Sequence, residues 1–405
     1  MRTPEKPLRS RRVVLYASVL QVLLVAFSAR AQAPAPSRAP ELAKLPVIKE
    51  LPDPFLMNNG RRVANQSDWL KRRDEIAELL LSYEYGHPAP APGNLKSSEI
   101  SAKPAEGFDA VERQVMLSMG QDRKLSLRLI LTVPQGKKGP FPVVVKGDLC
   151  WGRIPSSILA AAVGRGYIVA EFDRTEIAPD SADRTKGVYL HYPDHDWAAL
   201  CAWAWGYHRV IDYLTGDKIV DARRIAVTGH SRGGKAVLLA GALDERISLT
   251  APNDSGCGGA GCYRIQGEKS EDIGAITKRF PFWFQPHFAD FVGHVGQMPF
   301  DQHFLKALVA PRALLTTEAL GDLWANPLGS EVTYLAAKEV YKFLRAADRI
   351  AIHYRAGKHE QNAGDWNVLL DFADLQFFGK AGGTKFNQLP FPEVPGAFTW
   401  KAPAR

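Results

Sequence analysis

The sequence has few cysteines, and their spacing matches no zinc knuckle. The four are Cys150, Cys201, Cys257 and Cys262. In an oxidising compartment they could form two disulfides, and buried free thiols are an equally good expectation. Long runs of Lys and Arg are also absent beyond residue 31, which excludes the basic stretches typical of nucleic-acid binding. The apolar run from Val13 to Phe27 is too short to span a bilayer comfortably, so it favours a cleaved leader over a membrane anchor.

The first 31 residues have the layout of a signal peptide. Five Lys and Arg residues precede the apolar run, and small residues follow it at Ala29 and Ala31. We expect cleavage after Ala31, because cleavage after Ala33 would leave Pro34 directly behind the cut. No cysteine stands directly after the apolar run, so a lipid anchor has no attachment point. The paired arginines at 11–12 leave both the general and the twin-arginine export routes open.

The formal net charge of +8 comes mostly from this leader. The leader carries six Lys and Arg and one Glu, a net of +5, so the exported chain retains +3 (8 minus 5). We therefore expect no nucleic-acid partner and, after cleavage, no membrane partner. A hydrophobic content of 46% is ample for a large core and argues against disorder.

The stretch 224–243 combines a short apolar strand, a tight turn and an apolar helix. Ser231 stands at the turn, within GHSRG at 229–233, which satisfies G-x-S-x-G. Glycines flank the serine because strand and helix approach too closely there for side chains. The turn lifts the hydroxyl to the start of a helix whose free N–H groups can stabilise an oxyanion. Ser231 is therefore predicted to be the nucleophile of a serine hydrolase rather than a solvated turn residue.

Strand and helix patterns extend on both sides of this turn. A helix at 69–85 is followed by two alternating stretches, 111–119 and 125–133, that predict an antiparallel hairpin. Beyond it, helices alternate with β-rich runs at 142–147, 167–173, 224–230, 247–252, 312–317 and 349–354. This order predicts a mostly parallel sheet with helices on both faces. We expect one α/β-hydrolase catalytic domain over 55–400, preceded by a Pro- and Ala-rich lead-in at 32–54.

Two stretches are longer than the connections that a minimal α/β sheet needs. They are a polar loop at 174–196 and an aromatic-rich insertion at 256–303. Insertions after strand ends line the mouth of α/β active sites, where aromatic faces can stack on sugar or lignin-like rings. For most of these aromatic residues we expect instead that they form the insertion's own core.

A serine nucleophile needs a base, and in this fold the histidine comes last in the chain. His359 fits, because it follows the last predicted strand across Gly357. His353 is the rival, but it lies inside that strand. His191 and His195 could be read as a metal pair, and we expect them instead as loop residues.

The base needs an acid to orient it, and two aspartates are candidates. Asp254 directly follows the strand that comes after the helix next to Ser231. Asp322 follows the penultimate strand, where α/β-hydrolases ordinarily have the acid. Either could reach His359.

Several short segments together resemble the glucuronoyl esterase family. They are GHSRGGK at 229–235, PNDSGCGGA at 252–260, FPFWF at 280–284, DQH at 301–303, APR at 310–312, LWANP at 323–327, GKH at 357–359 and DW at 365–366. The match runs from about residue 141 to 378, and Arg and Lys at offsets one and four from the serine are unusual among serine esterases. The resemblance implies hydrolysis of the ester that joins 4-O-methyl-glucuronic acid on xylan to lignin alcohols, with no metal or organic cofactor.

The resemblance also implies residue roles. Ser231 is the nucleophile, His359 the base, and Arg232 an oxyanion stabiliser. Lys235 is a ligand of sugar hydroxyls. Tyr263 and Trp324 are the aromatic residues expected at the sugar.

This chain departs from fungal members of the family. Asp254 stands where they have a glutamate, Tyr263 where they have a tryptophan in the sugar pocket, and His230 and Glu360 where they have cysteines. Bacterial members often use the later acid position. We therefore expect Asp322 as the acid, with Asp254 as the alternative.

These patterns predict an exported, monomeric serine esterase that works through an acyl-enzyme on Ser231. A same-chemistry alternative is an acetyl or feruloyl esterase acting on decorated xylan. A second alternative is a catalytically silent hydrolase-fold protein that binds carbohydrate. The presence of Ser231, His359 and the two acids argues against the silent alternative.

Overall fold

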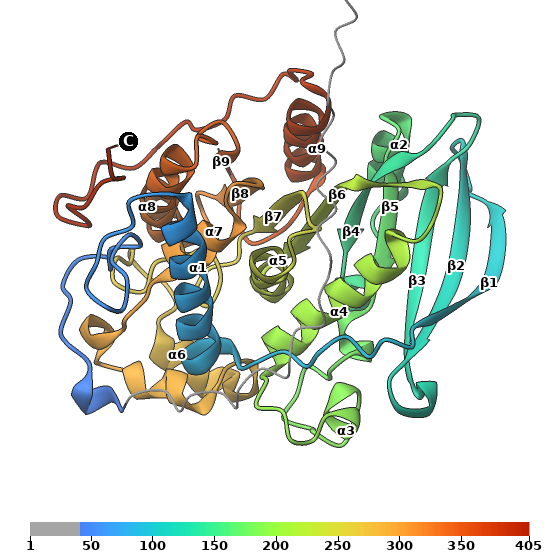
Figure 1. The fold of residues 1–405 in the computed structure, drawn as a ribbon. Coiled ribbons are helices and arrows are strands. Elements are labelled where there is room, and N and C mark those ends of the chain that lie inside the picture. The colour runs from blue at the N-terminus through green and yellow to red at the C-terminus, as the bar shows by residue number, and fades with distance from the viewer. Residues whose placement is uncertain (1–40, 405) are drawn as a thin grey trace, which may run out of the picture. The chain divides into compact units, whose positions relative to one another are not determined.

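The computed structural model describes residues 41–404, which build a nine-stranded sheet with helices on both faces (Figure 1). The expected leader at 1–31 and the first part of the expected lead-in, 32–40, lie outside the described residues. Along the sheet the order is β1-β2-β3-β5-β4-β6-β7-β8-β9. The strands are β1 (Lys96–Pro104), β2 (Ala110–Met119), β3 (Leu125–Pro134), β4 (Phe141–Lys146), β5 (Ile168–Phe172), β6 (Val220–His230), β7 (Leu249–Asn253), β8 (Ala313–Ala319) and β9 (Ile350–Arg355).

The sheet is antiparallel at its leading end and parallel thereafter. β1, β2 and β3 pair antiparallel, as do β3 and β5, and every later pair from β5 to β9 is parallel. The parallel part confirms the expected α/β-hydrolase arrangement. Because parallel strands end at the same edge, the turns after β6, β7, β8 and β9 meet there.

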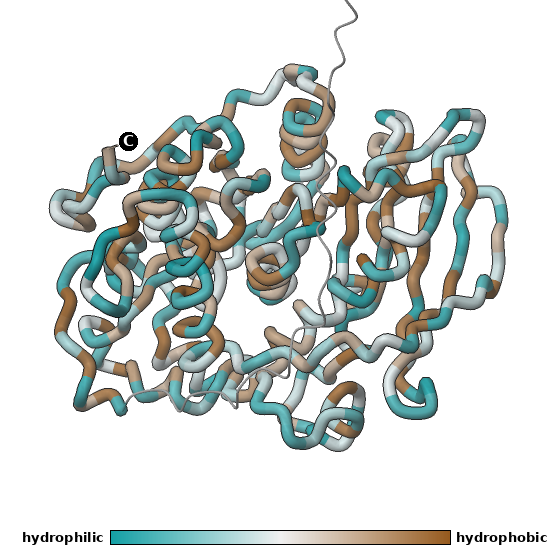
Figure 2. The backbone as a smooth tube through the Cα atoms, in the orientation of Figure 1, coloured by the Kyte–Doolittle hydropathy of each residue, from teal (hydrophilic) through white to brown (hydrophobic). Residues whose placement is uncertain are grey.

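Helices cover both faces because strand side chains alternate between them. Val143 and Val145 of β4 share a core with Trp203, whereas Val144 packs into a second core with Leu159. Figure 2 shows apolar residues along the central strands and the covering helices. The helices are α1 (Gln66–Leu80), α2 (Ser156–Gly164), α3 (Val188–His191), α4 (Ala199–Leu214), α5 (Arg232–Leu243), α6 (Ile273–Arg279), α7 (Gln302–Val309), α8 (Pro327–Phe343) and α9 (Ala363–Phe378).

Most predicted elements are found close to their expected bounds. The hairpin forms between β2 and β3, with Gly120 at a positive φ of 77° in the turn. The predicted helix at 69–85 is α1 continued by a short π-helix, η2 (Leu81–Tyr85). The insertion at 256–303 contains α6 and three short 3₁₀ helices, η6 (Pro281–Trp283), η7 (Pro286–Phe291) and η8 (Val295–Gln297). Most of its aromatic residues are buried, as expected, but Phe280 and Phe282 are not.

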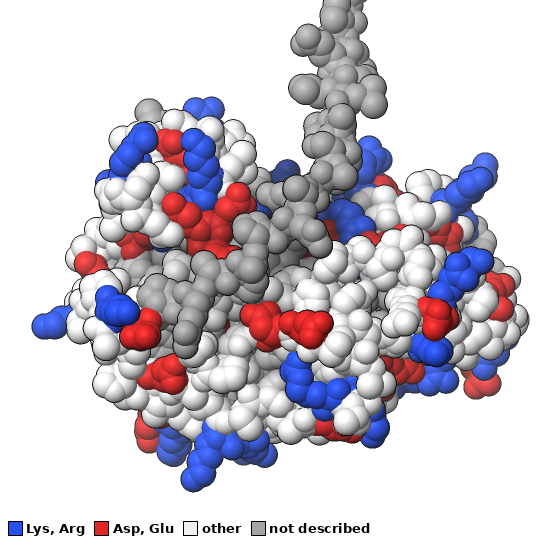
Figure 3. Space-filling model, turned by 60° about the horizontal axis from the view of Figure 1, so that its bottom comes forward, with Lys and Arg blue, Asp and Glu red and all other residues white. Residues whose placement is uncertain are grey.

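Charge is mixed on the surface. On the face in Figure 3, Lys and Arg lie interspersed with Asp and Glu. Many charged groups are paired; Arg113, for example, lies 2.7 Å from Glu99 and 3.2 Å from Asp217. All four cysteines are free thiols, three of them buried. Within residues 41–404 no helix is long and apolar enough to cross a bilayer.

Candidate active site

The turn at Ser231 joins the end of β6 to the start of α5. The serine has φ 55° and ψ −123°, a strained combination for a residue with a side chain. Both motif glycines are required because a side chain at either position would clash. A Cβ on Gly229 would lie 2.5 Å from the carbonyl oxygen of Gly233, and a Cβ on Gly233 would overlap Oδ1 of Asp148. The close approach of strand, helix and Asp148 therefore holds the serine, which is half-buried, at the tip of the turn, where it lines a pocket.

Asp148, which is buried, holds the turn from beneath. Its Oδ2 accepts the N–H of His230 at 3.0 Å and its Oδ1 accepts Nη1 of Arg174 at 2.5 Å. Burial acts to raise the pKa of Asp148, but the charges of Lys146 and Arg174 together with the His230 hydrogen bond bring it below its ordinary value. Asp148 is therefore held as a carboxylate that fixes the elbow.

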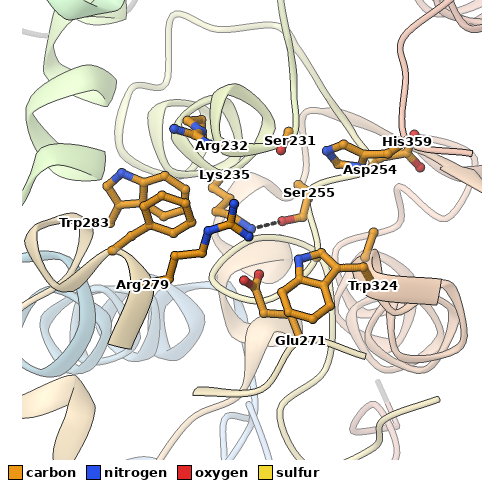
Figure 4. A pocket seen from close by; sticks show the side chains of 13 residues that line it. Ser231, Arg232, Lys235, Asp254, Ser255, Glu271, Arg279, Trp283, Trp324 and His359 are labelled. Carbon is orange, nitrogen blue, oxygen red and sulfur yellow. Dashed lines mark hydrogen bonds between the residues drawn. The ribbon is translucent and has the colours of Figure 1, made fainter. Parts of the chain in front are cut away.

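His359 lies in the loop after β9, and its imidazole lies beside Ser231 (Figure 4). Its Nδ1 is 2.5 Å from Oδ2 of Asp322, in the turn after β8. An ionised carboxylate only accepts hydrogen bonds, so Nδ1 carries the proton and Nε2 is left as an acceptor. This is the tautomer that a general base needs.

Asp254 lies close to this pair without taking the same contact. One ligand atom each of Asp254, Asp322 and His359 lies within 4.8 Å of the other two. The Asp254 carboxylate instead accepts the N–H of Ala319 at 2.7 Å and faces Nη2 of Arg355 at 3.3 Å. Burial, aided by the charge of Asp322, raises the pKa of Asp254 to about 7. Of the two candidate acids, Asp322 is thus the one in hydrogen-bond contact with His359.

His230, directly before the nucleophile, packs against the histidine of this pair. The rings of His230 and His359 are 4.4 Å apart between centroids. His230 Nδ1 lies 2.6 Å from Oδ1 of Asn253, whose amide donates to Thr317 Oγ1 at 3.0 Å. Burial and the neighbouring His359 lower the pKa of His230 to about 4, so this imidazole is uncharged near neutral pH.

Arg232 is fixed by a carboxylate and by aromatic rings. Its Nη1 donates to Oδ2 of Asp180 at 2.6 Å, and Asp180 Oδ1 also accepts the indole N–H of Trp283 at 2.8 Å. The guanidinium carbon lies 4.6 Å from the Trp283 ring centroid and 4.9 Å from that of Phe280. The buried Nε of Arg232 has no hydrogen-bond partner among residues 41–404. Arg232, the residue after the nucleophile, therefore keeps one buried N–H without an acceptor in the described part of the chain.

Lys235, one turn further along α5, is buried with only part of its donor capacity used. Its Nζ donates to the carbonyl oxygens of Ser255 and Cys257, each at 2.5 Å. An ammonium has three N–H donors, so one is left without an acceptor in the part of the chain that the structure describes. Burial lowers the pKa of Lys235, although the charge of Glu271 acts in the opposite direction.

These side chains surround a pocket of about 270 Å³ (Figure 4). One part of its wall is aromatic, with Phe280 and Trp283 in parallel stacking at 3.8 Å. The polar part includes Lys235 and Glu271, and burial raises the pKa of the Glu271 carboxyl. The complete lining is Ser231, Arg232, Lys235, Asp254, Ser255, Gly256, Glu271, Arg279, Phe280, Trp283, Trp324, Ala325 and His359. The pocket thus combines hydrogen-bonding groups with aromatic faces beside the serine, as a carbohydrate ester site requires.

Comparison with known proteins gives one family. A family model described as fungal glucuronyl esterase matches residues 117–345. A carbohydrate esterase from an unknown prokaryotic organism is 31% identical over 82% of this chain and 90% of its own length. The 4-O-methyl-glucuronoyl methylesterase of Podospora anserina is 33% identical over 75% of this chain and 62% of that enzyme. The chain belongs to the glucuronoyl esterase family.

Solved structures of the family share the fold. The glucuronoyl esterase of Caldicellulosiruptor kristjansonii superposes with a TM-score of 0.75 at 32% identity, covering 91% of this chain and 100% of that one. A variant of the glucuronoyl esterase from Sporotrichum thermophile, in complex with methyl 4-O-methyl-β-D-glucopyranuronate, gives a TM-score of 0.68 at 27% identity over 83% of this chain and 90% of that one. The α/β-hydrolase architecture expected from the sequence is therefore that of the family.

Tyr263 is not part of the pocket wall, which corrects one expectation. The side chain is buried, and its hydroxyl hydrogen-bonds with the carboxylate of Glu84 and the amide of Gln302. The phenol is therefore held by interior groups, and Tyr263 is not among the residues that line the pocket. Trp324, in contrast, lines the pocket and is 46% exposed.

His353 and His195 lie where the sequence placed them, in a strand and in a loop, whereas His191, expected in a loop, belongs to helix α3. His353 is on β9, with Nδ1 3.4 Å from the carbonyl oxygen of Lys385, and it does not line the pocket. His191 ends α3, and the ring of His195 contacts Tyr192 and Trp197. None of these histidines belongs to the candidate site.

Three side chains of the site escaped the sequence reasoning, and two of them line the pocket. Glu271 and Arg279 both line the pocket, and Asp180 positions Arg232 from the polar loop before α3. Glu271 and Arg279 stand at the two ends of the α6 segment, a pattern that is also typical of a solvated helix. Only the folded structure, in which both side chains line the same pocket as Ser231, distinguishes a site role from a solvated helix surface.

Proposed function

We propose that this protein is an exported serine esterase that hydrolyses the ester between 4-O-methyl-glucuronic acid of glucuronoxylan and a lignin alcohol. The observation that carries the proposal is the joint position of Ser231 and His359 at a pocket lined by Lys235 and Glu271. Relatives named 4-O-methyl-glucuronoyl methylesterase, at 30–33% identity, support the same reaction and the same acid part of the substrate.

The proposed cycle follows from the contacts at the elbow. The Oγ of Ser231 attacks the ester carbonyl while Nε2 of His359 takes its proton, and Asp322 on Nδ1 stabilises the resulting imidazolium. The oxyanion then lies at the start of α5, where the first backbone N–H groups have no intrahelical acceptor. Arg232, which lines the pocket beside Ser231, supplies a further donor. His359 returns its proton to the leaving alcohol, and water hydrolyses the acyl-enzyme by the same route.

The acid part of the substrate occupies the polar half of the pocket. The third N–H of Lys235 and the carboxylate of Glu271 bind sugar hydroxyls, since a cationic donor and an anionic acceptor together match a diol. Trp324 offers an aromatic surface to the sugar ring. We assign no sugar contact to Tyr263.

The export of the protein and the limits of its domain belong to the same proposal. Residues 1–31 are removed on export, 32–54 form the lead-in and 55–400 the catalytic domain. The mature protein acts as a monomer without nucleic-acid or membrane partners. N-terminal sequencing of the exported protein checks the cleavage site, and its mass in solution checks the monomer.

The test compares two esters. The mature protein is expected to hydrolyse benzyl glucuronate with a much higher kcat/KM than p-nitrophenyl acetate, and the Ser231→Ala variant is the matched blank. Activity confined to the acetate, or to acetylated or feruloylated xylan, would replace the glucuronoyl reaction with one of the other xylan esterases. Binding of xylan without turnover of any ester would point to a silent binding protein.

A further inference from the structure

Trp151 is a large aromatic residue held rigidly at the surface next to the elbow. It ends η4 (Leu149–Trp151), the short 3₁₀ helix after β4, and 49% of it is exposed. The guanidinium of Arg174 lies 4.4 Å from the indole centroid, and Arg174 is itself fully buried, between this ring and Trp203 at 5.0 Å. Arg174 is fixed in turn by Asp148. An exposed ring with such support loses little freedom when a ligand packs on it.

The position of Trp151 relates it to the leaving group. Its ring is 6.2 Å from that of His230, and His230 is 4.4 Å from His359. In the proposed cycle, the leaving alcohol takes its proton from His359 and must therefore emerge beside that imidazole. The ring of His230 thus contacts the rings of both His359 and Trp151, so one ring links the indole to the imidazole that protonates the alcohol. Trp151 lies outside the lining of the pocket that takes the sugar.

The surroundings of Trp151 suit an uncharged ring better than a sugar. The burial that lowers the pKa of His230 leaves this neighbour uncharged near neutral pH. Arg174 and Asp148 are buried and bonded to each other, and Arg153 is paired with Glu112 at 3.0 Å and Glu171 at 2.8 Å. Sugar sites join aromatic faces to accessible hydrogen-bonding groups. Here Arg174, although its Nε and Nη2 have no partner among residues 41–404, is fully buried, and the Arg232 guanidinium, 5.8 Å from the indole centroid, is bound to Asp180.

We infer that Trp151, with His230 beside it, forms a subsite for the aromatic ring of the ester's alcohol. This inference rests on the proposed function, because it assumes that His359 protonates the leaving alcohol. It deepens that function by assigning the alcohol specificity to a residue outside the sugar pocket. An aryl alcohol stacks on the indole, whereas a methyl alcohol is too small to reach it.

The test is a ratio of two activities in one variant. For Trp151→Ala, the ratio of kcat/KM for the benzyl ester of glucuronic acid to that for the methyl ester should fall about three- to tenfold, the range for one lost aromatic pair. Trp151→Phe, which retains a ring, should keep most of the ratio. Leu190→Ala, which truncates another exposed apolar side chain (62% exposed) on α3, should leave the ratio unchanged. Trp151→Leu keeps apolar volume without a ring and serves if the alanine variant does not fold.

Each outcome bears on one idea only. If the wild-type protein hydrolyses neither ester, the proposed function fails before the subsite is reached. If it hydrolyses both and the ratio is the same in Trp151→Ala and Trp151→Leu as in wild type, the alcohol subsite is wrong. If instead the variants lose activity only on a methyl ester carried by a xylo-oligosaccharide, Trp151 contacts the glycan and the inference is overturned.

Discussion

The two acids near His359 give a prediction whose size depends on pH. Replacing Asp322 by Asn removes the charge that holds Nδ1 of His359 at 2.5 Å. Comparable losses in serine hydrolases cost about 10⁴ in kcat. We therefore expect kcat of Asp322→Asn to fall about 10³- to 10⁴-fold, with KM little changed, at any pH where the wild-type enzyme is active.

Asp254→Asn should behave differently below and above neutral pH. Burial raises the pKa of Asp254 to about 7, so below that pH the group is mostly protonated and its replacement by a neutral amide removes no charge. Above it the variant removes an anion that lies within 4.8 Å of the imidazole and of Asp322. At an effective dielectric constant of about 20, a charge at 4.8 Å alone would stabilise an imidazolium by about 3 kcal/mol, and Arg355, whose Nη2 lies 3.3 Å from the Asp254 carboxylate, offsets much of this. We expect less than about a twofold loss near pH 6 and about a tenfold loss near pH 8.

The assay is kcat and kcat/KM on benzyl glucuronate for wild type, both single variants and the double variant, measured near pH 6 and pH 8. A double variant close to Asp322→Asn alone would show that the acids act on one imidazole rather than independently. If Asp254→Asn is already as slow as the double variant near pH 6, while Asp322→Asn is near wild type, the reasoning is refuted and Asp254 orients the base.

Three further outcomes follow from the same structure. Ser231→Ala should abolish turnover at unchanged thermal stability, and steady-state kinetics with a melting curve would check both. Arg232→Ala should lower kcat about 10²- to 10³-fold with a small change in KM, and Asp180→Asn should cause a smaller loss of the same kind; a change in KM alone would reassign Arg232 to substrate binding. Burial lowers the pKa of His303 to about 4, below its unfolded value near 6.5, so the stability it supports above 6.5 should be lost as pH falls towards 4, by up to about 1.4 kcal/mol per pH unit. Urea unfolding of wild type and His303→Gln across this range should give a flatter profile for the variant, and parallel profiles would contradict the assignment.

Local patterns in the sequence were enough for the elbow and for most of the sheet. Ser231 lies between an apolar strand and an apolar helix, and the contacts that demand Gly229 and Gly233 are made within or next to that unit. β1, in contrast, could not be predicted. It is the edge strand, almost all of its residues are exposed, and its sequence, KSSEISAKP, lacks the alternation that a half-buried strand shows.

The sequence limits the candidates for the acid to Asp322 and Asp254 but does not decide between them. Asp322 and Asp254 both follow strands that end at the same edge, so the pattern places both near His359. What separates them is where each carboxylate finds its donors. Asp254, at a positive φ of 41°, directs one oxygen to the N–H of Ala319 and the other towards Arg355, and neither contact has a local signature.

Tyr263 shows why a residue role cannot be transferred from a family to this chain by sequence position alone. Glu84 is fully buried on η2, and burial raises its pKa to about 8, so it is mostly a neutral acid near pH 7 that needs interior hydrogen-bond partners. The Tyr263 hydroxyl and the Gln302 amide supply them, which holds the phenol in the interior. The position of this aromatic ring is thus decided by a carboxyl group 179 residues earlier in the chain. Under the proposed function, the buried Glu84 thus leaves Trp324, which lines the pocket, as the aromatic side chain that we expect at the sugar.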